Sequence, residues 1–391
     1  MSEKPLSILI SGGGVAGASL ALMLARQPGF KTQPIITLIE RSPVPRTTGQ
    51  AIDIRGPAVD VIRDAKAQSA TSEYEILRGE LAGMLLDGVN EAREKGVQAN
   101  VVYGETIRAM DDRDDGSGVD VTFTNGKLPN QKFDVVVAAD GISSTSRSLI
   151  FGKEDKREHV QPSGLYLGFF SIPRIPEDDE TWRWANFAPG LAIHLRPHRN
   201  QKTMGVYLSI CNAKKERNPE LESIVHADVA AQKTYLRQRF RNSQWQTERF
   251  LDGLDASEDF YMSHWCQVRT PQWAKGRCVT LGDAAFATMG IGTSFAMIGA
   301  YCIAGELSKI ASSKEVPQAL QSYERIFRPF VAKHEMTLPG FPQLANPQTV
   351  WGTWIMHTIM KTVVLLRIPQ MMMWAFGGEG KESWKLPEYG W

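Results

Sequence analysis

The stretch of residues 6–26 reads LSILISGGGVAGASLALMLAR. Its first five residues are an apolar run typical of a buried strand, a glycine-rich turn follows, and residues 18–26 have helical composition. A second apolar run, residues 35–39, ends at Glu40-Arg41, near the distance at which an acidic residue is expected after such a turn. The order of strand, glycine turn, helix and strand predicts the start of a βαβ unit.

The glycines of SGGGVAG have separate physical roles. Gly12 permits the tight turn, Gly14 lets a pyrophosphate approach the backbone, and Gly17 allows the helix to pack closely on the strand. The first amides of the following helix then supply N–H donors and a partial positive charge. Glu40 is placed to accept hydrogen bonds from ribose hydroxyls. A glycine turn without a ligand is the alternative, and the flanking strand, helix and Glu40 argue against it.

Far downstream, the apolar run 278–281 ends in Gly282-Asp283, and Gly290-Ile291-Gly292-Thr293 then opens a helix over residues 294–308. A second strand that ends in a glycine and a carboxylate indicates one long cofactor held at both ends, as FAD would be. The positive end of the later helix would face the flavin pyrimidine edge, where it favours reduced, anionic flavin. A loop that only caps a core helix is the alternative.

Composition narrows the class of protein. The chain has 391 residues, 42% of them hydrophobic, and a formal net charge of +1 without a polybasic tract, so a small molecule is a more natural ligand than a nucleic acid. The four cysteines are far apart and lack the paired spacing of a zinc site, so they are interpreted as reduced core residues and no metal site is predicted.

The two ends of the chain bear on location. No charged leader with a long apolar stretch precedes the first strand, so an intracellular, cytoplasmic protein is expected. Residues 350–376 are rich in Trp, Met, Ile and Leu, but His357, Lys361, Arg367 and Pro369 interrupt them before a membrane-spanning length. A pair of packing helices is predicted, and a contact of the Trp and Met face with a lipid surface is the less favoured alternative.

The pattern between the two glycine regions predicts an inserted domain. Residues 74–89 read as an amphipathic helix that carries Arg78, and residues 133–139 read as a buried strand before Asp140-Gly141. Residues 164–211 then change to aromatic strands and turns, residues 219–241 read as a helix, and a last strand covers 260–268. The predicted domains are a discontinuous nucleotide-binding domain (1–163 and 269–345), an antiparallel substrate domain (164–268) and a C-terminal helical segment (346–391).

Three motifs in order give the chain a family resemblance: GGGVAG with Glu40-Arg41, the segment ADGISSTSR at 139–147, and WAKGR at 273–277 leading into GDAA at 282–285. The segments EILRGEL (75–81) and LPEYGW (386–391) match as well. The chain resembles the FAD-dependent aromatic hydroxylases, the single-component flavoprotein monooxygenases that include para-hydroxybenzoate hydroxylase and the tetracycline-inactivating monooxygenases, and its ending is similar to fungal members. The resemblance implies an α/β fold with a Rossmann-like FAD-binding domain of the GR2 type.

The resemblance also implies residue roles. It implies that Asp283 binds a ribityl hydroxyl of FAD and that Arg78 lies near the phosphate or the ribityl chain. The Asp140-Gly141 motif would serve both FAD and the passage of NADPH, with Ser144 and Arg147 bracing the loop. The implied FAD-binding residues are Gly12, Gly14, Gly17, Glu40, Arg41, Ala51, Arg78, Asp140, Asp283, Gly292 and Thr293.

The implied reaction is the hydroxylation or epoxidation of an aromatic or polyketide-like molecule in secondary metabolism. NADPH would reduce FAD, and O2 would form a flavin C4a-hydroperoxide that transfers its distal oxygen. His194, Tyr207 and His264 are candidate bases only because they lie in substrate-domain strands, so no catalytic residue is assigned. A flat hydrophobic substrate would contact an aromatic pocket formed by Tyr166, Phe169, Phe170, Trp182, Trp184 and Phe187.

Two segments depart from the family pattern. Only residues 64–70 stand where the family carries a few dozen residues over the pocket, and residues 286–292 lack the usual proline after Asp283. Three alternatives therefore stay open: a reductase or dehydrogenase on the same scaffold, a degenerate FAD-binding protein, and a flavin-dependent halogenase. The halogenase is disfavoured because residues 182–186 begin its WxWxIP motif but do not complete it.

Overall fold

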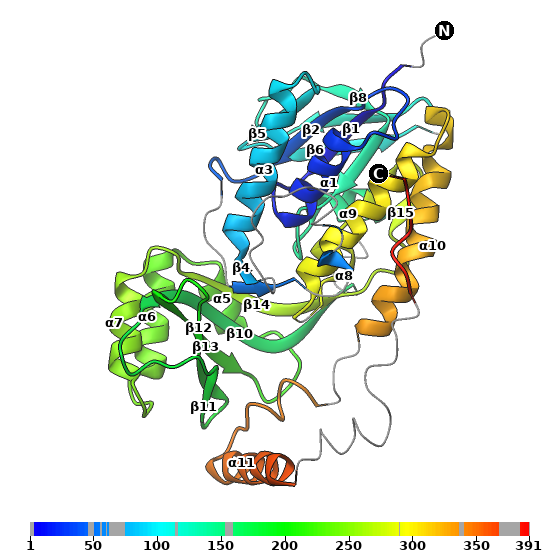
Figure 1. Ribbon diagram of the computed structural model, residues 1–391. Helices are drawn as coiled ribbons and strands as arrows, with labels where there is room; N and C mark the ends of the chain where they lie inside the picture. The colour runs from blue at the N-terminus through cyan, green and yellow to red at the C-terminus, as the bar shows by residue number, and fades with distance from the viewer. Residues whose placement is uncertain are drawn as a thin grey trace.

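The computed structural model describes residues 4–45, 51–54, 57–59, 61, 75–113, 116–152, 159–288, 290–335, 340–366 and 384–390. It has two main parts, a helix-covered parallel sheet and a separate antiparallel sheet (Figure 1). The chain enters the second part through β10 and returns through β14. This arrangement confirms the predicted α/β fold with an inserted antiparallel sheet.

The parallel sheet has the order β15-β16-β9-β1-β2-β5. Its strands are β1 (Ser7–Ser11), β2 (Ile35–Glu40), β5 (Ala99–Tyr103), β9 (Val135–Ala138) and β16 (Cys278–Thr280), with the short β15 (Ala274–Lys275) antiparallel at one edge. The apolar runs predicted as strands at 6–10, 35–39 and 278–281 are confirmed. The strand predicted over residues 133–139 is shorter in the structure: Phe133 ends β8, β9 covers Val135–Ala138, and the Asp134 carboxylate between them accepts a hydrogen bond from the Ser7 amide at 2.9 Å.

The two faces of the parallel sheet bury different layers. Ile8 and Ile10 pack against helices, whereas Leu9, between them, packs against a three-stranded sheet, as strand alternation requires. The helices are α1 (Val15–Arg26), α3 (Arg78–Glu94), α9 (Gly292–Ser308) and α10 (Val316–His334), the last following the 3-10 turn η2 (Ser313–Glu315). The opposite layer consists of β6 (Ile107–Asp112), β7 (Val119–Phe123) and β8 (Gln131–Phe133), next to α4 (Thr145–Phe151).

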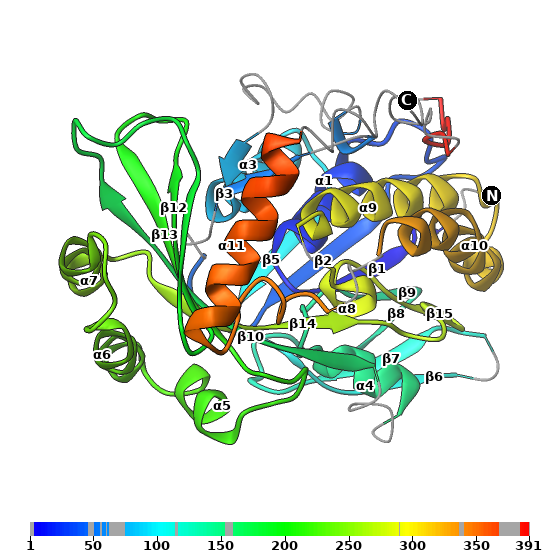
Figure 2. The same ribbon diagram turned by 90° about the horizontal axis from the view of Figure 1, so that it is seen from below.

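The second part is a five-stranded antiparallel sheet of order β11-β12-β13-β10-β14. Its strands are β10 (Val160–Pro173), β11 (Arg183–Phe187), β12 (Leu191–Pro197), β13 (Thr203–Cys211) and β14 (Tyr261–Val268). Three helices, α5 (Pro219–Val225), α6 (Val229–Phe240) and α7 (Thr247–Ala256), cover one face (Figure 2). We call the opposite face, which looks toward α11 and the parallel-sheet part, the inner face.

Two predicted helices have different limits in the structure. Residues 219–241 form α5 and α6 because Asn218 and Asp228 each cap a separate helix with their side chains. The helix predicted from residue 74 begins at Arg78, since β4 (Glu75–Leu77) pairs instead with β3 (Ala51–Asp53). The domain limits at residues 163 and 268 stay predictions, and β10 already begins at Val160.

Of the predicted pair of packing helices in residues 350–376, only the first lies within the described residues, and residues 367–376 lie outside them. One helix, α11 (Val350–Leu365), is described, and its Trp351 and Trp354 are each 68% exposed. The segment before it is held to the antiparallel sheet, because Gln348 donates to the Cys211 carbonyl at 2.9 Å, and the helix then extends beyond that anchor (Figure 2). Within the described residues, no helix is long and apolar enough to span a bilayer.

Candidate functional site

Three sequence motifs meet at the carboxyl edge of the parallel sheet. The Ala139 amide donates to the Ser11 carbonyl at 2.8 Å, and the Leu281 amide donates to the Ala138 carbonyl at 2.9 Å. These bonds align the ends of β1, β9 and β16, so the glycine loop, Asp140-Gly141 and Gly282-Asp283 leave the sheet side by side. In open α/β sheets this edge is where ligands bind.

The glycine loop has the geometry expected of a phosphate-binding turn. Gly12 has φ +114°, and a Cβ there would lie 2.4 Å from the Ala139 carbonyl oxygen. A Cβ on Gly17 would lie 1.9 Å from the Gly12 carbonyl oxygen, so α1 approaches its own loop very closely. At Gly14, by contrast, a Cβ would meet nothing within 4 Å. The backbone is therefore tightly enclosed at Gly12 and Gly17 and open at Gly14.

Glu40 holds the glycine loop as well as ending β2. Its Oε2 accepts a hydrogen bond from the Gly13 amide at 2.8 Å, and its Oε1 accepts one from the Ser42 amide at 2.8 Å. The neighbouring Arg41 is exposed. Each carboxylate oxygen keeps further acceptor capacity, because an ionised carboxylate offers about four lone-pair sites. The two residues thus stand at the edge of the loop, where the sequence predicts a ribose contact.

The Asp140-Gly141 segment is braced internally. The Asp140 carboxylate accepts hydrogen bonds from the Ser144 hydroxyl and from the Ser146 amide, the latter at 3.0 Å. The buried Arg147 guanidinium donates to the carbonyls of Ile142 and Ala284, both at 2.9 Å. Burial lowers the pKa of Arg147, and Asp140 opposes that change. The predicted bracing by Ser144 and Arg147 is present, and Arg147 also ties this loop to the residue after Asp283.

Asp283 lies among groups that are distant in sequence. Its Oδ2 lies 3.6 Å from Arg78 Nη2, and its Oδ1 lies 3.4 Å from the position of a Cβ on Gly292. A Cβ on the preceding Gly282 would lie 2.8 Å from Ala16 Cβ, so this turn packs on the start of α1. Thr293 follows Gly292 in the first turn of α9. Ala51 pairs with Leu77 in the β3–β4 ladder, directly before Arg78.

Two helices start at this edge without side-chain caps. Neither Gly14, before α1, nor Ile291, before α9, accepts a hydrogen bond through its side chain from the first turn. The first amides of an α-helix have no partner inside the helix, and they attract anions. The edge therefore combines the open backbone at Gly14, the uncapped starts of α1 and α9, and the Asp283 carboxylate. This combination fits a long ligand with phosphates at one end and an electron-accepting ring at the other.

The inner face of the antiparallel sheet lies next to this edge. Val268, the last residue of β14, donates through its amide to the Ala287 carbonyl at 3.0 Å, shortly after Asp283. His194 and Tyr207 are paired across β12 and β13 and lie on the inner face, with ring centroids 6.0 Å apart. His264 lies on the face covered by α5, where its Nδ1 is 2.6 Å from Glu222 Oε1. The three candidate bases are therefore divided between two faces.

The predicted aromatic pocket is divided in the same way. Phe169, Trp182 and Trp184 are on the inner side, where the Trp182 and Trp184 rings pack near His194 with centroids 6.3 and 4.4 Å away. Tyr166, Phe170 and Phe187 instead pack with the helices. Tyr166 and Phe187 therefore do not join the inner-side aromatic residues, because side chains alternate along a strand and both faces of this sheet are apolar, whereas Phe170 still lines one of the hollows at this sheet.

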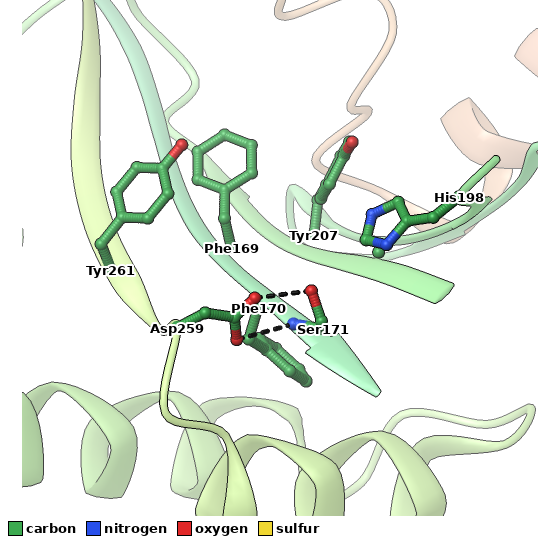
Figure 3. Close-up of a pocket in the computed structure, with 8 residues that line it drawn as sticks. Phe169, Phe170, Ser171, His198, Tyr207, Asp259 and Tyr261 are labelled. Atoms are coloured by element: carbon green, nitrogen blue, oxygen red, sulfur yellow. Dashed lines mark hydrogen bonds between the residues drawn. The ribbon is translucent and has the colours of Figure 1, made fainter. Parts of the chain in front are cut away.

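Two hollows adjoin the antiparallel sheet. One small hollow is lined by Phe169, Phe170, His198, Gly205, Tyr207, Tyr261 and the pair Ser171 and Asp259, whose hydrogen bonds are drawn in Figure 3. A larger one lies near residue 341, where β10 begins and β14 ends; it is lined by Gln161, Pro162, Ser163, Lys215, Trp265, Cys266, Gln267, Arg269, Phe341 and Pro342. The sequence pattern did not indicate Ser171 or Asp259, because their contact joins residues 88 positions apart.

The short loop after Asp283 turns inward. Phe286 is 1% exposed and packs against Trp273 and Phe327, with ring centroids 4.7 and 5.5 Å away. The aromatic side chain of this loop therefore belongs to the core. The other departure from the family pattern, at residues 64–70, lies outside the described residues.

Comparisons with known proteins agree with this geometry. The family described as "FAD binding domain" matches residues 85–337. The FAD-dependent monooxygenase asL4 of Sarocladium schorii is 26% identical over 441 aligned residues, covering 98% of both chains, and monooxygenase CTB7 of Cercospora beticola is 29% identical, covering 100% of this chain and 99% of CTB7. The crystal structure of the tetracycline destructase Tet(51) is 26% identical, covers 95% of this chain and 96% of its own, and superposes with a TM-score of 0.69.

Proposed function

Since this chain belongs to the FAD binding domain family and is an FAD-dependent monooxygenase, we propose that it uses NADPH and O2 to oxygenate a planar aromatic or polyketide-like molecule held on the inner face of the antiparallel sheet. The observation that carries the proposal is the meeting of the three FAD motifs beside the end of β14. A cofactor held at this edge has the aromatic inner face as its neighbour. Secondary metabolism is the proposed setting.

The residues at the sheet edge fit FAD. Gly12, Gly14 and Gly17, with the amides of α1, hold the pyrophosphate, and the open backbone at Gly14 lets it come close. Asp283 holds the ribityl chain. When bound, FAD supplies hydride acceptance from NADPH and the activation of O2. The other proposed contacts come from the end of β2, strand β3, the start of α3, the second motif and the start of α9: Glu40, Arg41, Ala51, Arg78, Asp140, Gly292 and Thr293.

The chain's own contribution to the chemistry is electrostatic and steric. With FAD bound, the uncapped start of α9 would stabilise negative charge on the flavin ring, which would favour acceptance of electrons without a charged side chain. Asp140, Ser144 and Arg147 fix the loop that NADPH passes. The inner face excludes water from the aromatic substrate and orients it.

The experiment starts from purified protein. A flavin absorption spectrum establishes FAD loading, and NADPH oxidation and H2O2 release are then followed with and without a series of phenols under 18O2. Substrate-stimulated NADPH use, with one labelled oxygen atom in the product, supports the proposal. Bound FAD that NADPH never reduces, or NADPH oxidation that yields only H2O2 with the whole series, contradicts it.

A further inference from the structure

The inner face carries an aromatic cluster around one buried histidine. We define the His194 cluster as Trp182, Trp184, His194, Tyr207 and Ser209. Strand pairing places Trp184 opposite His194 and His194 opposite Tyr207, so these three side chains share one face. Ser209 pairs with Ala192 two positions along, and it therefore lies on the same face. The cluster thus joins neighbouring strands of the sheet.

The two nitrogens of His194 have different surroundings. Nε2 lies 3.0 Å from the Ser209 hydroxyl, whereas Nδ1 is buried and has no hydrogen-bond partner. The whole side chain is 92% buried, as its residue is 8% exposed. Nearly all buried polar atoms in folded proteins have a partner, and leaving one without a partner costs free energy. The unpaired Nδ1 is a site for a hydrogen bond that a ligand supplies.

A second histidine of the same hairpin shows the contrast. His198 follows β12 and lies in the loop that leads to β13. Its Nδ1 is 2.9 Å from the Thr203 hydroxyl. Burial lowers the pKa of both histidines, that of His194 to about 4, so His194 is neutral near pH 7. Its unpaired nitrogen therefore does not call for an anionic partner. A neutral oxygen group satisfies it.

The indoles beside His194 are partly exposed to solvent. Trp182 is 55% exposed and Trp184 is 45% exposed, although both rings contact the buried imidazole. Together the two indoles offer an aromatic surface beside the imidazole, on which a flat ring can stack.

We propose that His194 Nδ1 is the substrate-recognition group of the inner face, and that it hydrogen-bonds to a hydroxyl or carbonyl oxygen of a planar aromatic substrate. This inference rests on the proposed function and adds the chemical class of the bound group. The Ser209 hydroxyl can donate to or accept from Nε2, so either imidazole tautomer is stable. Nδ1 accordingly accepts from a phenol or donates to a carbonyl or phenolate oxygen, and the imidazole stays neutral in both cases.

The test compares two isosteres on the FAD-loaded protein: 2-naphthol, which carries the hydroxyl, and 2-methylnaphthalene, which does not. Tryptophan fluorescence quenching measures both dissociation constants. We expect the wild-type protein to bind 2-naphthol about tenfold more tightly than 2-methylnaphthalene, the effect of one hydrogen bond. His194→Gln, whose amide replaces Nε2, should reduce that ratio to about one, and His194→Asn, whose amide replaces Nδ1, should retain part of it.

His198→Asn is the matched control, because it alters a buried histidine of the same hairpin whose Nδ1 already has a partner. It should keep the tenfold ratio. A wild-type ratio near one, or equal ratios in His194→Asn and His194→Gln, overturns the proposal. Nitrogen NMR of the seven histidines gives a second readout in unmutated protein: 2-naphthol should shift the His194 Nδ1 signal, and no shift at saturation overturns the proposal. Flavin content and NADPH oxidation are measured separately, so a failure of the proposed function is recognised on its own.

Discussion

The guanidinium of Arg78 lies 3.6 Å from the carboxylate of Asp283. Arg78 begins α3, and Asp283 begins α8 (Asp283–Phe286), so the two residues come from the separate segments before and after the antiparallel sheet. Their side chains are 45% and 27% exposed, so solvent screens the pair and it contributes little to stability. The contact therefore matters for position: it holds two polar side chains beside the start of α9.

Asp283→Ala should lower the FAD content of the purified protein, because it removes the acceptor proposed for the ribityl chain. Asp283→Asn separates two explanations. An amide oxygen still accepts a hydrogen bond but carries no charge, so it should retain more FAD than alanine if hydrogen bonding is the role of Asp283. The ratio of flavin to protein absorbance measures the result, and wild-type flavin content in Asp283→Ala would contradict the assignment.

Substitution by alanine should lower FAD affinity at Gly14 and protein stability at Gly17. Gly14→Ala places its Cβ in open space, so the fold is kept, while FAD affinity should fall about tenfold or more as the phosphate loses close backbone contact. Gly17→Ala places a Cβ 1.9 Å from the Gly12 carbonyl oxygen, and should cost about 3 kcal/mol of stability or more. Urea unfolding and FAD titration distinguish the two. A stable Gly17→Ala protein would show that α1 can move away from the loop.

Glu40→Gln should weaken FAD binding more than folding, by about tenfold in affinity, because a charged acceptor at the ribose edge is lost. Glu105→Gln is the matched control. Glu105 is fully buried, and although burial favours a higher pKa, backbone amides of Asn125, Thr106 and Lys127 hold its pKa below the ordinary value. Its substitution should cost about 2 kcal/mol of stability without changing FAD affinity per folded molecule. An equal loss of FAD affinity in Glu40→Gln and Glu105→Gln would contradict a specific role of Glu40 in FAD binding.

The acid stability of the protein should depend on His194. Its pKa is lowered to about 4 in the folded state from 6.5. Between those values the unfolded chain binds a proton that the folded protein excludes, so the free energy of unfolding falls as pH decreases through this window. Each such proton contributes a slope of about 1.4 kcal/mol per pH unit. Urea unfolding from pH 7 to 4 should give a shallower dependence in His194→Asn, and an identical slope would show that His194 is protonated in the folded protein.

The strands and helices of the nucleotide-binding part were predictable because their signals are local. The glycine turn, the apolar run before it and Glu40 after it lie within one short stretch, and the structure confirms β1, α1 and β2. The start of α3 was misplaced because residues 75–77 pair with Ala51–Asp53, a contact that amphipathic periodicity does not reveal. Arg147 was expected to brace its own loop, but its bond to the Ala284 carbonyl depends on β9 and β16 being neighbours.

The antiparallel sheet shows why the rest could not be predicted. Tyr166 and Phe169 stand in one aromatic strand, and both are buried, so composition cannot tell which of them faces the helices. The same ambiguity placed His194 and His264 together as candidate bases. Strand register resolves both cases, since it assigns Phe169 and His194 to the inner face and Tyr166 and His264 to the other.

The cofactor-binding fold follows from local sequence, because a βαβ unit is encoded by contiguous residues whose spacing and backbone freedom are readable along the chain. The tertiary structure alone decided which side chains share a site. It joined Arg78 to Asp283, turned Phe286 into the core and left His194 Nδ1 without a partner on the inner face. The physical reason is that contact and burial depend on strand order and register, which arise from packing between segments that are distant in sequence.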